Sequence, residues 1–435
     1  MKYVGTRGRA PAIGLGEALV AGLAADGGLY VPEALPAFVA ADFEGCDTLP
    51  TVAARLLRPF FAGDALAHDL DAICHEALDL PLPLRPIAPG SWLLELFHGP
   101  TAAFKDFAAR FLAACLARLR GADEPVRTVL VATSGDTGAA VAAAFHRRAG
   151  FRVVILYPDR RVSPRQAHQL GAFGDNVQAL RVAGSFDDCQ ALAKRALGDA
   201  ALKARVPLTS ANSISLGRLL PQMAYYALAA LERARAGGAP PAFIVPTGNL
   251  GNAFAAILAR ACGLPIGEIV LATNANRTLP DFFAGADYTP RASVATLANA
   301  MDVGAPSNFE RLRWLYPDDA ALRRALRAEA VDDATITATL REHAARGLVV
   351  CPHTATALHL LGRRRAAGDH GDAIVVATAH PAKFDSIIEP LLGHPVDTPP
   401  ALAALLARPA RATPIRADYA ELRAVLERPG AAPAA

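Results

Sequence analysis

The feature that most constrains the fold is a repeat of short apolar segments, glycine-containing turns and alanine-rich helical runs that begins near residue 126. The expected strands cover residues 128–133, 152–157, 242–246, 268–273 and 373–378. The turn SGDTG (134–138) precedes a helical run at 139–148, and the turn TGNLGN (247–252) precedes another at 253–262. Continuous apolar strands that alternate with helices predict an α/β fold with parallel sheets covered on both faces.

Proline-rich segments divide the chain of 435 residues, a length typical of two to three domains. The first 90 residues form helical patches with proline-rich joints, and residues 80–89, with four prolines, are expected to be a linker. A tail with scattered prolines follows residue 393 and is expected to wrap the surface. We therefore expect an N-terminal domain at 1–90, a core at 91–392 and a C-terminal segment at 393–435 packed on the core.

Composition excludes several functional classes. Hydrophobic residues make up 52% of the chain and charged residues 20%, so a sizeable core forms and disorder is excluded. A net charge of +3 offers no footprint for a nucleic acid, and no apolar run is long enough for a membrane span. The six cysteines lie far apart without metal-ligand spacing, which predicts reduced thiols, no metal site and a cytoplasmic protein.

Residues 95–107, ELFHGPTAAFKDF, bring Lys105 to the predicted start of a helix, between Phe104 and Phe107. Desolvation and the positive end of the helix dipole are expected to lower the pKa of this lysine. A partly neutral amine is what Schiff-base chemistry requires. The structural alternative is a surface lysine with an apolar stem.

Three further segments at the ends of expected strands offer binding groups. The small residues of GNLGN (248–252) expose backbone N–H groups as a phosphate cradle, although the pattern is neither a P-loop nor a dinucleotide motif. The turn TSGDTG (133–138) either caps its helix or holds an anion. In ATAHPAKF (377–384), the Thr378 hydroxyl can bond a ring nitrogen or its own backbone, while His380 and Lys383 alone carry no signal.

Taken in order, HGPTAAFKDF, TSGDTG, SANSISLGR (210–218), TGNLGN and ATAHPAKF resemble the sequence blocks of the bacterial threonine synthase family. The N-terminal stretch from YVGTRG to GLAADGGLYVPE is also similar, so the resemblance covers residues 3 to about 390. It implies a fold-type II (tryptophan synthase β-like) enzyme with a two-lobed core and pyridoxal 5'-phosphate as cofactor. The implied reaction, a carbon–oxygen lyase reaction, converts O-phospho-L-homoserine and water to L-threonine and phosphate. A monomer or homodimer is expected, with no nucleic-acid or membrane partner.

The resemblance also implies roles for single residues. Lys105 would bind the cofactor covalently, and Thr378 would bond its ring nitrogen. The cofactor phosphate would be held by Gly248, Asn249, Leu250, Gly251 and Asn252. The substrate phosphate would be held by Ser134, Thr137, Ser213 and Arg218, with Thr133 and Asn212 as secondary candidates. Asp136 stands where relatives often have an asparagine bonded to the cofactor's phenolic oxygen, so either it is protonated or its contact differs.

The mechanism that the resemblance implies needs a single mobile base. The freed Lys105 amine would take the Cα proton and then the Cβ proton, phosphate would leave from Cγ, and water would add at Cβ. A serine or threonine dehydratase would share the fold, the lysine and the glycine–asparagine loop. It has no substrate phosphate to bind, so Ser213 and Arg218 distinguish the two. The remaining alternatives are a non-catalytic amino-acid or phosphate-binding module and a binding protein without a cofactor.

Overall fold

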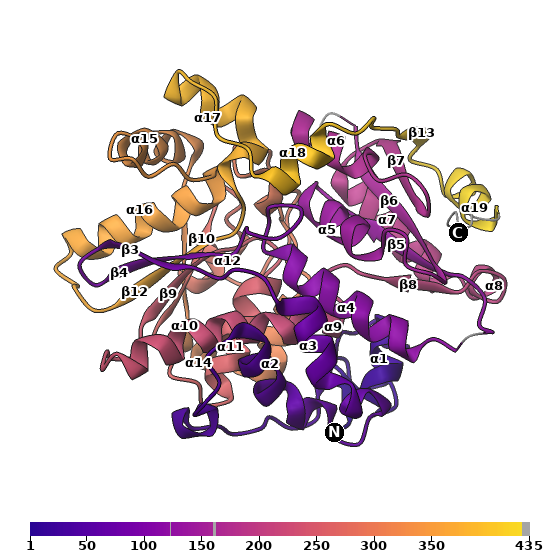
Figure 1. The fold of residues 1–435 in the computed structure, drawn as a ribbon, viewed down its shortest axis with the longest axis horizontal. Helices are drawn as coiled ribbons and strands as arrows, with labels where there is room; N and C mark the ends of the chain where they lie inside the picture. The colour runs from indigo at the N-terminus through magenta and orange to yellow at the C-terminus, as the bar shows by residue number, and fades with distance from the viewer. Residues whose placement is uncertain (122, 160–161, 429–435) are drawn as a thin grey trace.

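The computed structural model describes residues 1–121, 123–159 and 162–428, and two sheets dominate it (Figure 1). The six-stranded sheet has the order β11 (Arg327–Ala330), β10 (Ile269–Thr273), β9 (Ala242–Pro246), β12 (Ala373–Ala377), β4 (Ser91–Glu95) and β3 (Leu84–Ala88). The five-stranded sheet has the order β13 (Thr413–Arg416), β7 (Val177–Ala183), β6 (Phe151–Pro158), β5 (Arg127–Ala132) and β8 (Leu208–Ser210). Within these two sheets, the described neighbouring strands are parallel except for the pair β3 and β4. A separate two-stranded sheet of β1 (Tyr3–Gly5) and β2 (Tyr30–Pro32) is antiparallel. The expected parallel α/β architecture is therefore confirmed.

Each of the five strands expected from the sequence is present to within one residue at either end. The helices after the two glycine-containing turns begin earlier than predicted, because α5 (Asp136–Phe145) and α11 (Gly251–Ala261) start inside the motifs. The remaining strands were not predicted. They are short, as in β8, or interrupted by charged residues, as in β7 and β11, so they lack a continuous apolar run.

Side chains of the central strands alternate between two apolar layers, which shows that helices cover both faces of each sheet. In β6, Val153 and Ile155 belong to the large central core, whereas Val154 and Leu156 pack with α7 (Phe186–Gly198) and α19 (Tyr419–Glu427). In β12, Val375 packs in the layer that includes α15 (Asp333–Ala344) and α16 (Pro352–Ala366). Such two-sided burial is typical of parallel sheets.

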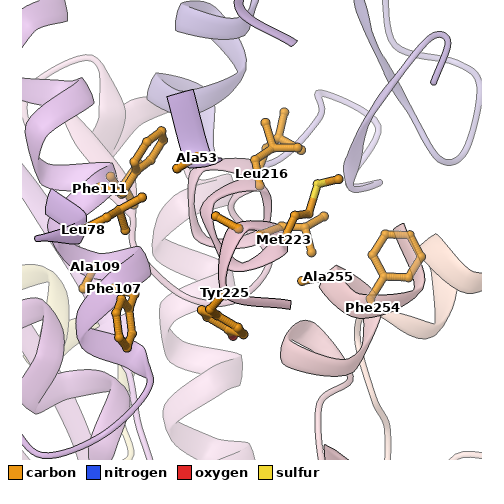
Figure 2. Packing of buried hydrophobic residues seen from close by; sticks show 14 of the residues in the cluster. Ala53, Leu78, Phe107, Ala109, Phe111, Leu216, Met223, Tyr225, Phe254 and Ala255 are labelled. Atoms are coloured by element: carbon orange, nitrogen blue, oxygen red, sulfur yellow. The ribbon is translucent and has the colours of Figure 1, made fainter. Parts of the chain in front are cut away.

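The large central core contains buried side chains of the N-terminal region and of strands from both sheets. Figure 2 shows buried side chains of α2, α3, α4, α9, α10 and α11 gathered there. The elements are β1 (Tyr3–Gly5), α1 (Leu15–Ala21), β2 (Tyr30–Pro32), α2 (Leu49–Leu57), α3 (Leu70–Leu78), α4 (Lys105–Leu119), α9 (Leu216–Leu219) and α10 (Met223–Arg235). The N-terminal helices thereby support α4 from the side opposite the five-stranded sheet (Figure 1).

Residues 80–89 are only partly the linker that the prolines predict, because residues 84–88 form β3 at the edge of the six-stranded sheet. Pro86 is tolerated there since an edge strand leaves one row of N–H positions unpaired. The segment after residue 393, which was expected only to wrap the surface, also contributes a strand to a sheet. Its strand β13 pairs with β7 and extends the five-stranded sheet, next to the C-terminal end in Figure 1.

The remaining helices complete the two layers around the sheets. They are α6 (Pro164–Gly171), α8 (Ala200–Lys203), α12 (Thr278–Phe283), α13 (Phe309–Leu315), α14 (Asp319–Ala325), α17 (Asp385–Leu392) and α18 (Pro400–Leu406). In the described part of the chain, no helix has the length and apolarity needed to cross a bilayer. The six cysteines are all buried and unbridged, as their spacing predicts.

Candidate active site

One cavity lies where the carboxyl ends of β5, β8, β9 and β12 meet, the place where open parallel sheets bind ligands. Every site residue expected from the sequence lines it. These residues are Lys105, Thr133, Ser134, Asp136, Thr137, Asn212, Ser213, Arg218, Gly248, Asn249, Leu250, Gly251, Asn252 and Thr378. The structure thus brings segments separated by more than 200 residues into a single site.

The loop before α4 is built to present Lys105 at the first position of the helix. Asp106 folds back on the loop and accepts hydrogen bonds from the Thr101 N–H (2.8 Å) and hydroxyl (2.6 Å). A side chain at Gly99 would place its Cβ 2.4 Å from Asp106 Oδ2, so the loop requires glycine there. The Phe104 N–H donates to the Thr378 carbonyl (2.9 Å), which ties the loop to the end of β12. Much of the HGPTAAFKDF motif therefore serves to position one amine.

The Lys105 amine lies in a desolvated, cation-rich part of the cavity. Its pKa is lowered to about 8: burial is the largest cause, the Asp136 carboxylate opposes it, and the positive charges of Lys383 and Arg218 add to the lowering. The Phe104 ring lies 5.6 Å from Nζ, whereas Phe107 turns away and packs against Tyr225. The predicted lowering of the Lys105 pKa is present, with Phe104 as its aromatic neighbour.

Asp136, in the first turn of α5, is a buried carboxylate with three polar neighbours. Its Oδ1 accepts hydrogen bonds from Lys383 Nζ (2.8 Å) and Gln166 Nε2 (2.9 Å), and its Oδ2 lies 3.9 Å from Lys105 Nζ. Burial alone would raise the pKa of Asp136, but the two ammonium groups outweigh it and hold the pKa well below its usual range. The sequence left two alternatives for Asp136, a protonated carboxyl or a contact other than the one to the cofactor's phenolic oxygen. The low pKa disfavours the protonated carboxyl and favours a different contact.

Two residues near Lys105 that the sequence did not mark as functional are candidates for a role in the site. Lys383 is fully buried beside Asp136, although nothing in ATAHPAKF beyond the motif itself marked it. His353, in the first turn of α16, lines the cavity and accepts the Ala300 N–H at Nε2 (3.1 Å), while its buried Nδ1 has no partner among the described residues. Burial lowers the pKa of His353 to about 4, so the ring is neutral at physiological pH.

The GNLGN turn forms a cradle at the N-terminus of α11. Leu250, the residue before the helix, has a left-handed backbone with φ of 64°, which turns the chain into the helix. The first N–H groups of any helix lack internal acceptors, so those of α11 face the cavity available for an anion. Asn249 fixes the turn through bonds to the Ser213 hydroxyl (2.8 Å) and from Asn308 Nδ2 (2.9 Å).

Arg218 supplies a positive charge on the side of the cavity that is expected to hold the substrate phosphate. It is 2% exposed, its Nη1 donates to the Ala211 carbonyl (2.6 Å), and its buried Nε has no partner among the described residues. Burial lowers the pKa of Arg218 to about 10, which leaves the guanidinium charged at neutral pH. The charge and the unpartnered Nε make Arg218 able to bind an anion in the cavity.

Thr133 and Asn212 have structural contacts that account for them. The Thr133 hydroxyl accepts the N–H groups of Gly135 and Gly138 (both 2.9 Å) and so caps the start of α5. Asn212 bonds both backbone groups of Ala132 and joins the ends of β8 and β5. For these two secondary candidates, the structural interpretation is the better supported.

The chemistry of the cavity wall fits pyridoxal 5'-phosphate. A reactive amine, a helix N-terminus for a phosphate and the Thr378 residue at the end of β12 face one space. Asn252 supports the fit, because Tyr225 and Tyr226 bond its Oδ1 and leave its buried Nδ2 without a partner in the described chain. That amide can donate to a ligand oxygen.

Comparisons with known proteins identify the class. The family model for pyridoxal-phosphate dependent enzymes matches residues 82–380, and models for the threonine synthase N terminus and C-terminal region match residues 2–78 and 354–426. A solved maize serine racemase shares the fold at 18% identity with a TM-score of 0.51. The class defined by fold and site is thus the fold-type II pyridoxal-phosphate enzyme, as expected.

Full-length relatives narrow the class to one family. Threonine synthases of Serratia marcescens and Escherichia coli are each 38% identical over 98% of this chain and 99% of their own length. The Escherichia coli threonine synthase structure superimposes with a TM-score of 0.91, and the pyridoxal-phosphate-bound Brucella melitensis enzyme with 0.89 at 34% identity; each covers 98% of this chain. The chain belongs to the threonine synthase family. Its function is threonine synthesis, with pyridoxal 5'-phosphate as cofactor.

Gly248 provides a test of the cradle. A Cβ at Gly248 would lie 2.8 Å from Met301 Cα and 3.2 Å from the Met301 carbonyl carbon, so one of two backbone segments must move. We expect Gly248→Ala to weaken cofactor binding by about 5- to 150-fold, since overpacking costs about 1–3 kcal/mol. An absorbance titration with pyridoxal 5'-phosphate measures the change.

The matched control is Gly362→Ala within α16, where, apart from the neighbouring backbone of the helix itself, no described atom lies within 4 Å of the new Cβ. That variant should bind the cofactor as the unmodified chain does. Equal affinity of the Gly248 variant would show that the cradle does not hold the cofactor phosphate.

Proposed function

We propose that the substrate is O-phospho-L-homoserine, converted with water to L-threonine and phosphate. The observation that carries this proposal is Arg218, a buried guanidinium that lines the same cavity as Lys105 and whose Nε has no partner within the described part of the chain. The cofactor phosphate accounts for the helix N-terminus of α11, so Arg218 is left for a second anion. A charge-assisted bond between guanidinium and phosphate is among the stronger polar contacts.

Residues from two segments assist Arg218 in this assignment. Ser134 and Thr137 flank the start of α5, and Ser213 lies opposite them beside the GNLGN turn; all three line the cavity. Their hydroxyls supply neutral donors around a dianion whose charge Arg218 offsets. This arrangement supports selectivity for a phosphorylated amino acid over serine or threonine.

The cofactor is held by three groups of this chain in the proposed mechanism. Lys105 binds it covalently between turnovers, the N–H groups of 248–252 hold its phosphate, and the Thr378 hydroxyl bonds its ring nitrogen. When bound, the cofactor acts as an electron sink that acidifies the substrate's α-carbon. A neutral hydroxyl at Thr378 leaves the ring nitrogen mostly unprotonated, which suits elimination and replacement better than transamination.

Lys105 performs the proton transfers. Once substrate frees its amine, Lys105 would remove the proton at Cα and pass that proton on to the conjugated system of the bound substrate, which makes the amine neutral again. It would then remove a proton at Cβ, which allows phosphate to leave from Cγ. The same amine returns a proton at Cγ before water adds at Cβ. A pKa of about 8 suits both directions, because an effective acid–base group titrates near the working pH.

A substrate panel tests the proposal. The holoenzyme is incubated separately with O-phospho-L-homoserine, L-serine and L-threonine, and phosphate, threonine and 2-oxo acids are measured. We expect equal amounts of phosphate and threonine from the first compound, at a rate at least about 100-fold above 2-oxo acid formation from the other two. If 2-oxo acids are the main products, the protein is a dehydratase. If none of the three compounds is converted, it is a non-catalytic binding module.

The surroundings of the site support two further parts of the proposal. We assign residues 1–90, 91–392 and 393–435 to an N-terminal domain, a two-lobed catalytic core and a C-terminal segment, of which 429–435 lie outside the described residues. The first part also contributes β3 and the last part β13 to the sheets of the core. The protein is proposed to work in the cytoplasm, in keeping with six unbridged cysteines.

A further inference from the structure

Lys383 is a charged side chain with no exposure and two fixed partners. Its Nζ donates to Asp136 Oδ1 (2.8 Å) and to the Thr101 carbonyl (2.7 Å). Its backbone is also held, since the Lys383 carbonyl accepts the Ser163 hydroxyl (3.0 Å). These bonds hold Lys383 in place, and it is not among the residues that line the cavity.

Asp136 uses its two oxygens differently. Oδ1 is shared between Lys383 and Gln166, which fixes the plane of the carboxylate. Oδ2 lines the side toward Lys105 Nζ, at 3.9 Å, too far for a direct hydrogen bond. The carboxylate is consequently paired with Lys383 and only loosely associated with Lys105.

The charges of this cluster constrain the protonation of Lys105. The cluster places the Asp136 carboxylate between two amines, and a cationic partner strongly favours the ionised form of a buried carboxylate. We propose that Lys383 is a positioning residue that serves as the permanent counter-ion of Asp136 and so leaves the Lys105 amine free to react. Without Lys383, Lys105 would itself become the counter-ion and would remain protonated.

The other ionisable groups around Lys105 do not take over this task. Arg218, from α9, adds positive charge, and His353, from α16, is neutral. Asp106, next to Lys105 in α4, accepts the N–H and hydroxyl of Thr101; burial raises its pKa, and its charge acts on Lys383 and Arg218 rather than on Lys105. Asp136 is thus the carboxylate that faces the amine, and its charge balance depends on Lys383.

The inference rests on the proposed role of Lys105 but can be tested without the reaction. Acetic anhydride acylates only neutral amines, so the initial labelling rate of Lys105 in the full-length chain freed of cofactor reports its protonation. Mass spectrometry of the peptide gives this rate, with the exposed Lys203 as internal reference. The wild-type rate should rise with pH through a midpoint near 8.

Three variants separate charge from packing. At pH 7, Lys383→Met should lower Lys105 labelling by about tenfold or more, because each unit of increase in its pKa reduces the neutral fraction about tenfold. Asp136→Asn should raise labelling, since the anion that favours the protonated amine is gone. The double variant Asp136→Asn with Lys383→Met should return the rate to within about threefold of wild type, because both charges are removed together.

The outcomes decide between the two roles. A labelling rate for Lys383→Met equal to wild type, or a fall that persists in the double variant, would overturn the proposal. If Lys383→Met does not fold, the rise expected in Asp136→Asn and its return toward the wild-type rate in the double variant still test the proposal. Unchanged labelling in Asp136→Asn, or a rise that persists in the double variant, would refute it. Wild-type labelling behaviour in a chain inactive on the phosphorylated substrate would instead refute the proposed function alone.

Discussion

Replacing Lys105 with alanine is expected to abolish the absorption band of lysine-bound cofactor and to lower kcat for threonine formation by at least about 10³-fold. The variant loses both the covalent attachment and the amine that moves protons at three carbons. The remaining wall, including the cradle at α11, can still hold the cofactor non-covalently. Absorbance spectra and single-turnover kinetics on O-phospho-L-homoserine measure the two losses separately.

The matched control is Lys203→Ala, an exposed lysine at the end of α8. It should retain both the absorption band and the rate. Circular dichroism confirms that the Lys105 variant is folded. A Lys105→Ala protein that keeps the absorption band would show that another amine binds the cofactor.

Arg218→Ala is expected to raise KM for O-phospho-L-homoserine by about 100-fold while the cofactor absorption band stays intact. A hydrogen-bonded charge pair that loses one partner in a desolvated site costs about 2–5 kcal/mol. Steady-state kinetics over a wide substrate range, together with absorbance spectra, separate substrate binding from cofactor binding. Inorganic phosphate should also become a weaker competitive inhibitor by a similar factor.

Arg346→Ala, with a side chain 69% exposed, is the control for loss of an arginine outside the site. It should leave KM unchanged, because a solvated surface ion pair contributes little. An unchanged KM in Arg218→Ala would remove Arg218 from the substrate site and would weaken the case against a dehydratase.

The strands predicted best are those whose burial is uniform. β9 lies inside its sheet, so every side chain is apolar and its limits are read directly from the sequence. β11 and β13 lie at sheet edges and contain charged or exposed residues, and their pairing depends on neighbours distant in the chain. For such strands, local sequence carries little of the stabilising free energy.

The site shows the same division. Lys105 and the GNLGN turn combine local features, namely a helix start and consecutive small residues, that predict chemistry before any contact is known. Lys383 lies 247 positions after Asp136 in the chain, and an isolated lysine near a strand end has no pattern that predicts burial. Whether Asp136 is ionised depends on Lys383, a partner that the sequence did not reveal.

The sequence by itself determined the parallel α/β class, the family, the cofactor and fourteen of the residues that line the cavity. It could do so because backbone periodicity and short motifs are local properties of the chain. Only the tertiary structure decided the charge state of Asp136, the orphaned donor of Arg218 and the burial of Lys383. These depend on desolvation and on distances between separate segments, and the electrostatic free energy of a charge changes with both.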